Sequence, residues 1–294
     1  MRSAYQTPLG KAYNCSIEDF VESKQYSDLV GKVDLILTSP PFPLVSPKAY
    51  GNRVGEDYKE WLCAVFMRLR PLLTTRGSLV IEIGNAWEKG RPTMSTVPLE
   101  TLISIRDQVE LYLCQQFIWS NPNKLPGPAT WVNVKRIRVK DSFTHIWWFS
   151  TTPNPDARNT RVLSPYKEGM EKLLARQGYN KGERPSGHNV GDGFLTRNKG
   201  SIPSNVLTFS NSVESIEYRR WCKEQGVPQH PARMPIKMVE FFVKMLTKKN
   251  ALVLDPFGGS NTTGRAAENL DRRWVSIERD PDYVLGSKGR FLKS

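Results

Sequence analysis

The residues "LVLDPFGGSNTTG", 252–264, are the most informative part of this chain about its fold. It begins as a short apolar run, reaches Asp255 and a pair of glycines, and continues into residues typical of a helix start. A strand that passes through a glycine turn into a helix is half of a βαβ unit, in which backbone N–H groups face a ligand. A second strand is predicted at "WVSIERD", residues 274–280, and it places Glu278 about twenty residues further on, where a carboxylate is suited to two ribose hydroxyls.

The glycine pattern of this stretch limits the kind of nucleotide that it can bind. It contains neither the GK[ST] sequence of a Walker A loop nor GxGxxG, which argues against ATP and NAD. A carboxylate beside a helix N-terminus suits an amino-acid group joined to a nucleoside, so we expect S-adenosylmethionine. The alternative is a purely structural turn. The candidate cofactor-binding residues here are Asp255, Phe257, Gly258, Gly259, Ser260, Asn261, Thr262, Thr263 and, on the next strand, Glu278.

A second motif, "LILTSPPFP" at residues 35–43, follows another apolar run. Proline has a fixed φ and no backbone N–H, so a Pro-Pro pair ends sheet pairing and stiffens the loop that follows. The loop then presents a hydroxyl, carbonyl groups and an aromatic ring, which together can hold a flat ring with a polar edge. Taken alone, it is equally consistent with a structural loop, but two such motifs, each after a strand, favour a functional site. The candidate catalytic residues are Ser39, Pro40, Pro41 and Phe42.

Short apolar runs alternate with helical patterns along the chain. The predicted strands are 33–37, 78–83, 115–119, 145–150, 251–254 and 273–277, and the predicted helices are 57–73, 99–113, 236–246, 261–270 and 281–286. This alternation predicts an α/β fold with a doubly wound, mostly parallel sheet covered on both faces. The run "HIWWFS", residues 145–150, lacks a crossover helix before it, so we expect an antiparallel strand there.

The middle of the chain has a different composition. Residues 153–228 are rich in Gly, Pro, Asn and basic residues, with aromatic residues at intervals. Long structureless segments are rare in compact domains, so this range is either a disordered linker or a functional insertion. We favour an insertion that orders partly on a ligand. It would divide the chain into a catalytic half at 1–152, a target-recognition insertion at 153–228 and a cofactor-binding half at 229–294.

The overall charge points to a polyanionic partner. The 294 residues carry a formal charge of +13 and a sequence pI of about 9.6, which suits nucleic acid or an anionic membrane surface. There is no apolar run long enough to span a membrane and no signal-peptide pattern at the start. The four cysteines and three histidines are scattered, so we expect reduced cytosolic thiols and no metal site.

The motifs together resemble a known family. "TSPPF" followed much later by "DPFGGSNTTG" is similar to the amino-group DNA methyltransferases in the permuted β order, with the catalytic half first. "HPARMPIKMVEFFVKML", residues 230–246, is similar to the helix before the cofactor strand of that family, and "AYNCSIEDF", residues 12–20, to its third strand and adenine-contacting turn. Residues 118–150 resemble the cytosine-N4 modification methylases of the PvuII type.

The resemblance implies a permuted, Rossmann-like, seven-stranded methyltransferase sheet, double-stranded DNA as the partner and S-adenosylmethionine as the cofactor. It also implies cofactor contacts from Cys15, Ser16 and Arg233. The chain has Asn14-Cys15 where the family often has Gly-Asp, which leaves backbone groups or Ser16 for the adenine amino group. It also has Met234 where a lysine is common, with Arg233 nearby. A modification enzyme of this type would act in the cytoplasm, alongside a cognate restriction endonuclease.

The family chemistry assigns roles to the first loop. An exocyclic amine is a poor nucleophile, and Ser39 Oγ with the Pro40 carbonyl would accept its N–H groups. Phe42 would stack on the base, which must be flipped out of the duplex. In the family Ser with Phe accompanies cytosine-N4 methylation and Asp or Asn accompanies adenine-N6, so cytosine is favoured. Adenine-N6 methylation and a non-catalytic nucleic-acid-binding role stay open, whereas cytosine-C5 methylation would need a Pro-Cys nucleophile that is absent.

Basic residues outside the two motifs have two interpretations. "NVKRIRVK", residues 133–140, alternates charged and apolar residues and fits either a solvated edge strand or a segment that grips phosphates. The basic residues in or beside the insertion are interpreted as phosphate contacts or surface charges. They are Arg158, Arg161, Arg184, Arg197, Lys199, Arg219 and Arg220.

Overall fold

The computed structural model describes residues 1–43, 53–176, 182–183, 185, 187, 189–190, 195–210 and 216–292. Arg184 of the predicted insertion therefore lies outside the described residues. The chain forms two compact units, of which the first comprises 1–157 with 205–294 and the second comprises 158–204. Residues 153–157 and 205–228, which the sequence placed in the insertion, thus belong to the first unit.

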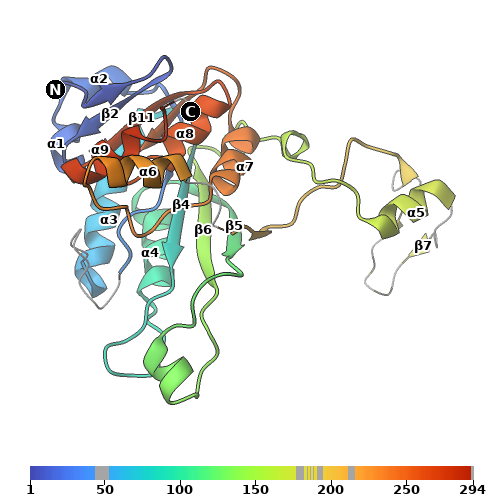
Figure 1. Cartoon of the computed structure of the whole chain (residues 1–294). Helices are drawn as coiled ribbons and strands as arrows, with labels where there is room; N and C mark the ends of the chain where they lie inside the picture. Colours follow the sequence, from blue (N-terminus) through green and yellow to red (C-terminus); the bar gives the residue numbers. More distant parts are fainter. Residues whose placement is uncertain are drawn as a thin grey trace. The chain divides into compact units, whose positions relative to one another are not determined.

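A sheet of nine strands forms the centre of the first unit (Figure 1), in the order β1-β2-β11-β10-β3-β4-β6-β5-β9. The strands are β1 (Tyr5–Gln6), β2 (Gly10–Asn14), β3 (Val33–Thr38), β4 (Leu73–Gly84), β5 (Tyr112–Ser120), β6 (Phe143–Ser150), β9 (Val206–Thr208), β10 (Leu252–Asp255) and β11 (Arg273–Glu278). From β2 to β4 every pairing is parallel, and β6 is antiparallel to both of its neighbours, as predicted for "HIWWFS".

The predicted number of seven strands is wrong by two. Seven strands from β2 to β5 form the continuous centre, and a short strand is added at each edge. At one edge β1 forms a hairpin with β2, and at the other β9 pairs in parallel with β5. These edge strands have two and three residues, which is too short for an alternating apolar pattern to be visible in the sequence.

Helices cover both faces of the sheet, which confirms the doubly wound α/β prediction. They are α1 (Ile17–Val21), α2 (Lys24–Leu29), α3 (Gly55–Leu69), α4 (Val97–Gln108), α6 (Ile216–Glu224), α7 (Ile236–Leu246), α8 (Thr262–Asn269) and α9 (Pro281–Lys288). Apolar residues of α1, α3 and α4 form one core with alternate residues of the strands. On the other face, Phe242 of α7 packs edge-on against Phe117 of β5, with ring centroids 5.1 Å apart.

Two predicted helices end earlier than expected. The helix predicted at 57–73 ends at Leu69, because Pro71 cannot continue the helical hydrogen bonding, and a 3-10 turn at Arg70–Leu72 leads directly into β4. The helix predicted at 99–113 ends at Gln108, and Glu110 adopts a φ of 55° before β5 begins.

The second unit contains little regular structure among its described residues. It has a 3-10 turn (Asn159–Arg161), helix α5 (Glu168–Arg176) and a short antiparallel pair, β7 (Gly182–Glu183) with β8 (Asn189–Val190). Arg197 is paired with Glu171 of α5 at 2.8 Å. Both side chains of that salt bridge are exposed, so Arg197 is a surface charge with a partner in the same unit.

The described residues offer neither a membrane-spanning helix nor a metal-binding cluster. No helix there is both long and apolar enough to cross a bilayer. No group of three or more His, Cys, Asp or Glu side chains there could hold a metal ion.

Candidate active site

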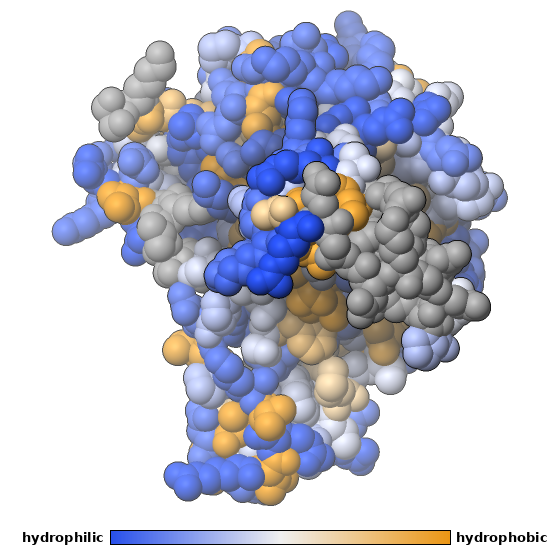
Figure 2. All heavy atoms as spheres, turned by 90° about the vertical axis from the view of Figure 1, so that its right-hand side faces the viewer, coloured by the Kyte–Doolittle hydropathy of each residue, from blue (hydrophilic) through white to orange (hydrophobic). Residues whose placement is uncertain are grey.

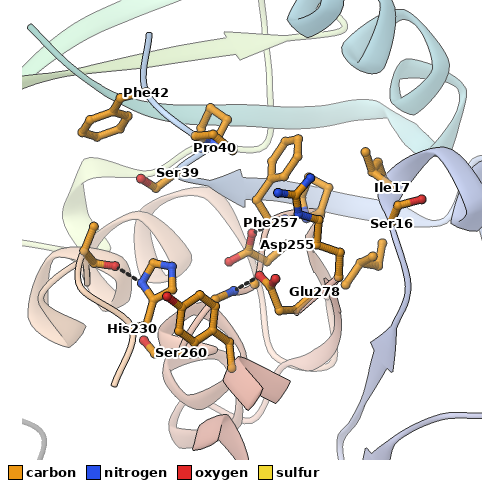
Figure 3. A pocket seen from close by; sticks show the side chains of 18 of the residues that line it. Ser16, Ile17, Ser39, Pro40, Phe42, His230, Asp255, Phe257, Ser260 and Glu278 are labelled. Atoms are coloured by element: carbon orange, nitrogen blue, oxygen red, sulfur yellow. Dashed lines mark hydrogen bonds between the residues drawn. The ribbon is translucent and has the colours of Figure 1, made fainter. Parts of the chain in front are cut away.

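The two sequence motifs meet at the carboxyl ends of the parallel strands. Strands β3 and β10 are adjacent and parallel, with Leu35 opposite Val253, so the loops that follow them leave the sheet side by side. Both loops line one open cavity (Figure 3), whose empty space is about 1180 Å³ including its mouth. The cavity is open to solvent, and residues of both motifs line it.

Asp255 ties the two motifs together. Its carboxylate Oδ1 accepts hydrogen bonds from Thr38 Oγ1 at 2.7 Å and from the backbone N of Phe257 at 3.1 Å. The side chain is only 2% exposed, and burial raises the pKa of its carboxyl. Asp255 therefore fixes the end of β3, which carries the Ser39 loop, against the glycine turn.

The glycine turn requires glycine at two successive positions. A Cβ on Gly258 would lie 2.1 Å from Ser276 Oγ, and Gly259 has a φ of 50° with His230 Nε2 3.0 Å from where its Cβ would be. The backbone N of Gly259 donates to Glu278 Oε2 at 2.8 Å. Glu278, at the end of β11, thus fixes the position of the glycine turn beside the cavity.

Glu278 is both a structural anchor and a candidate ligand-binding group. Its second oxygen, Oε1, accepts the backbone N–H of Asp280 at 2.9 Å, and burial raises the pKa of the carboxyl. A carboxylate has about four acceptor sites. With one site used on each oxygen, the remaining sites can accept the two hydroxyls of a ribose.

Most of the predicted site residues line this one cavity. They are Ser39, Pro40, Pro41, Phe42, Cys15, Ser16, Arg233, Asp255, Phe257, Gly258, Gly259, Ser260, Thr262 and Glu278. The roles assigned to them remain predictions. Figure 3 shows Ser39, Pro40 and Phe42 beside the end of β3, and Asp255, Phe257 and Glu278 deeper among the loops of the other motif.

Asn261 and Thr263 are not among the lining residues. Both side chains are about 1% exposed. Asn261 adopts a φ of 52° and caps α8, since its Oδ1 accepts the N–H of Gly264 at 3.0 Å and its Nδ2 donates to Tyr5 Oη at 2.9 Å. Asn261 therefore supports the turn from behind.

The residues from β2 into α1 present backbone and apolar groups to the cavity. Burial raises the pKa of the Cys15 thiol to about 11, so it is protonated at neutral pH and is a weak nucleophile. The hydroxyl of Ser16 caps α1, accepting from Asp19 N at 3.0 Å and donating to Asp19 Oδ2 at 2.7 Å. A ligand amino group near Ser16 would compete with this cap.

An aromatic and apolar wall was not predicted from the sequence. Trp61 of α3 packs against Phe257 with ring centroids 5.6 Å apart and donates its Nε1–H to Glu18 Oε1 at 2.9 Å. Ile17 lines the same part of the cavity. Within the apolar pattern of α3, Trp61 is indistinguishable from a core residue, so no signal in the sequence marked it.

Glu82 is the most consequential residue that sequence reasoning missed. It lies within β4, is 4% exposed, and accepts a hydrogen bond from Ser39 Oγ at 2.5 Å. Burial raises the pKa of its carboxyl, and the bond from Ser39 opposes part of that rise. Because the Ser39 hydrogen is directed to Glu82, the lone pairs of the Ser39 oxygen are available to the cavity. The available signal was a lone acidic residue inside the apolar run "SLVIEIG".

We expect Glu82→Gln to change the pH dependence of stability. Above the ordinary pKa of 4.5 the unfolded chain releases this proton while the folded chain retains it, so the stability of the wild type falls as pH rises toward the raised native pKa. The amide stays neutral and can still accept from Ser39. The Tm advantage of Glu82→Gln over the wild type should therefore grow with pH, measured by thermal unfolding from pH about 4 to about 8. The exposed Glu60→Gln is the control, and a difference in Tm that is constant with pH would contradict this assignment.

Comparisons with known proteins were made for the whole chain. The sequence profile of the DNA methylase family matches residues 33–288. The type II methyltransferase M.PvuII of Proteus hauseri is 42% identical over 293 residues, which cover 99% of this chain and 86% of that protein. The type II methyltransferase M.BglII of Bacillus subtilis is 25% identical over 256 residues, which cover 86% of this chain and 61% of that protein.

Solved structures give the same picture. The PvuII DNA methyltransferase, described as cytosine-N4-specific, superposes with a TM-score of 0.80 and 37% identity, covering all of this chain and 90% of that one. The M1.HpyAVI–SAM complex superposes with a TM-score of 0.58 and 19% identity, covering 97% of this chain and all of that one. At that lower identity the likeness establishes a shared fold alone.

Proposed function

Because this chain belongs to the DNA methylase family, we propose that it transfers a methyl group from S-adenosylmethionine to the N4 amine of a cytosine flipped out of duplex DNA. One observation carries the proposal: the Ser39 loop and the Gly258–Gly259 turn line one and the same open cavity. The similarity to M.PvuII, which extends over nearly the whole chain, supports cytosine as the target. Ser39 with Phe42 supports it independently.

The residues around the glycine turn fit the proposed cofactor. S-adenosylmethionine, when bound, supplies an electrophilic sulfonium methyl group. Glu278 retains acceptor sites for the ribose hydroxyls, and Ile17, Trp61 and Phe257 offer an apolar and aromatic wall for the adenine ring. The two glycines of the turn before α8 let its backbone approach a ligand closely.

The residues around the first loop fit an exocyclic amine. Ser39 Oγ and the Pro40 carbonyl accept the two amine N–H groups and draw the nitrogen lone pair out of conjugation with the ring. Glu82 orients the Ser39 hydroxyl by accepting a hydrogen bond from it. As the nitrogen took the methyl carbon, the bond from that carbon to the sulfonium sulfur would break and leave a neutral thioether. The surplus proton of the nitrogen would leave to solvent through the open mouth of the cavity.

The ring of Phe42 packs beside Gly84. We expect Phe42→Ala to lower kcat/KM for DNA. A Cβ at Gly84 would lie 2.6 Å from the Phe42 ring, so the ring occupies the space that glycine leaves. Stacking on a base is worth about 1–3 kcal/mol, so kcat/KM for DNA should fall by about 10-fold to 100-fold. Phe42→Tyr, which retains the ring, is the matched control. Steady-state methylation kinetics measure the effect, and unchanged kcat/KM in Phe42→Ala would remove Phe42 from the base site.

The proposed function is tested by expressing the chain in a host that lacks DNA methylation and sequencing the DNA by a single-molecule method. N4-methylcytosine at one recurrent sequence is the expected result. N6-methyladenine would instead support the alternative target. Absence of methylation, with purified protein that still binds DNA, would support a non-catalytic role.

We further propose residues 153–228 as the target-recognition region and a restriction endonuclease of the same specificity as a functional partner, without a stable complex. The free cysteines and the DNA substrate are consistent with action in the cytoplasm. Co-expression of the wild-type chain with that endonuclease should protect host DNA from cleavage.

A further inference from the structure

A projecting segment, residues 121–142, joins β5 to β6, and we call it the β5–β6 arm. Strands β4 and β5 both pair antiparallel with β6, so they run in the same direction, and β3 is parallel to β4. The arm therefore begins at the carboxyl end of β5, on the same side of the sheet as the Ser39 loop at the carboxyl end of β3. Figure 1 shows the arm extending beyond the ends of β5 and β6, at the bottom of the view.

The root of the arm is held firmly beside the catalytic loop. Asn85, which follows β4, donates its Nδ2–H to Asp141 Oδ1 at 2.8 Å, and Lys124 Nζ lies 3.3 Å from Asp141 Oδ2. His145 Nε2 contacts Asn85 Oδ1 at 2.9 Å. Burial raises the pKa of Glu82, the partner of Ser39, and the positive charge of Lys124 opposes part of that rise. The arm is thus a positioned element whose base adjoins the reacting groups.

The outer part of the arm is basic and apolar at once. Residues 133–140 are all exposed, and no strand forms there; a π-helical turn (Thr130–Val134) is followed by irregular chain. The prediction of a solvated edge strand is therefore wrong. The arm carries Lys124, Lys135, Arg136, Arg138 and Lys140 against the single acid Asp141. Leu125, Val134 and Val139 are 83%, 76% and 88% exposed.

Such a surface has a recognisable partner chemistry. Lysine and arginine side chains bind DNA phosphates, and exposed apolar side chains beside them enter grooves and wedge between base steps. A plain solvated surface would not need three large apolar side chains this exposed, and a purely apolar protein partner would not need the excess of positive charge. Figure 2 shows apolar and hydrophilic side chains intermixed over the lower projection, which the arm shares with the segment that follows β4.

We propose that the β5–β6 arm docks on the duplex next to the target base, with its basic residues on phosphates and Leu125 and Val139 as an apolar wedge that compensates for unstacking. The inference rests on the proposed function, since it requires a duplex substrate. Extracting a paired base costs a few kcal/mol. A wedge beside the Ser39 loop would offset part of that cost, because it would fill the space that the flipped base leaves in the stack.

The wedge is tested with Leu125→Ser/Val139→Ser. The substrate is a synthetic duplex carrying the sequence found by the sequencing experiment, with the target cytosine either paired or opposite a mismatched base. The double variant should lose about tenfold or more in kcat/KM on the paired duplex, which corresponds to about 1.4 kcal/mol, and recover most of it on the mismatched one. The control is Val30→Ser. Val30 is 47% exposed and precedes β3, so it lies at the amino end of that strand, away from the Ser39 loop.

The phosphate contacts are tested with Lys135→Gln/Lys140→Gln. Each phosphate contact that is lost should reduce the slope of log K against log salt by about 0.9, hence by about 2 for the pair. The control is Lys32→Gln/Lys249→Gln, two exposed lysines that precede β3 and β10 at the opposite edge. Fluorescence anisotropy with the same duplex over a series of salt concentrations measures the slopes.

The outcomes separate this inference from the proposed function. Arm variants that match their controls in kcat/KM and in salt slope, while the wild type methylates DNA, would overturn the arm alone. Equal losses on paired and mismatched duplexes would overturn the wedge. A wild type that methylates no DNA under any condition would overturn the proposed function and the arm with it.

Discussion

Ser39→Ala is expected to lower the rate of methyl transfer by about 10²-fold to 10³-fold, the loss typical when one preorganised polar contact at a reacting centre is removed. The alanine cannot accept an amine N–H, and it leaves Glu82 buried without its hydrogen-bond donor. The Pro40 carbonyl remains, so residual activity should persist. The loss should fall on kcat, because Ser39 acts on the amine as it becomes tetrahedral.

The measurement is transfer of a radiolabelled methyl group to duplex DNA, with cofactor and DNA binding determined separately. Ser39→Thr is the matched variant, since it restores a hydroxyl that can donate to Glu82, and it should recover part of the rate. A Ser39→Ala protein with the wild-type rate would mean that the hydroxyl has no part in the reaction. Loss of DNA binding in that variant would assign Ser39 a structural role.

Glu278→Ala is expected to weaken binding of S-adenosylmethionine by about 10²-fold or more, since hydrogen bonds to a charged group contribute about 1.5–3 kcal/mol each. The substitution removes the acceptors proposed for the ribose and also releases the N–H of Gly259 and of Asp280. Glu278→Gln should also bind poorly, because one end of an amide is a donor and would face one of these N–H groups.

Isothermal titration calorimetry with the cofactor measures this effect, with thermal unfolding to confirm that each variant is folded. The exposed Glu224→Gln on α6 is the control for a lost negative charge. Cofactor affinity in Glu278→Ala equal to that of the wild type would place the cofactor elsewhere. The two predictions are complementary: Ser39→Ala should spare cofactor affinity, whereas Glu278→Ala should lower it.

The buried strands and both ligand-facing loops can be predicted from local sequence patterns. Strands β3 and β10 are buried or half-buried along their whole length, and β11 is so after the exposed Arg273. All three are read as apolar runs, because local composition is enough where nearly every side chain is inside. The prolines after Ser39 and the Gly258–Gly259 pair are similarly local signals, since each restricts or frees the backbone of its own residue. Parallel neighbours then bring the two loops to one edge.

The distant residues that complete the site depend on long-range pairing and packing, which local patterns do not specify. Glu82 is adjacent to Ser39 because β4 pairs in parallel with β3, a register that no local pattern specifies. Trp61 reaches the cavity because of how α3 packs, and Asn261 faces away from the cavity because its side chain is needed to cap α8. In the β5–β6 arm the alternating pattern of 133–140 has no neighbouring strand to pair with, so it forms exposed irregular chain. Alternation shows which side chains could share a face, but a strand forms only where another backbone supplies its hydrogen bonds.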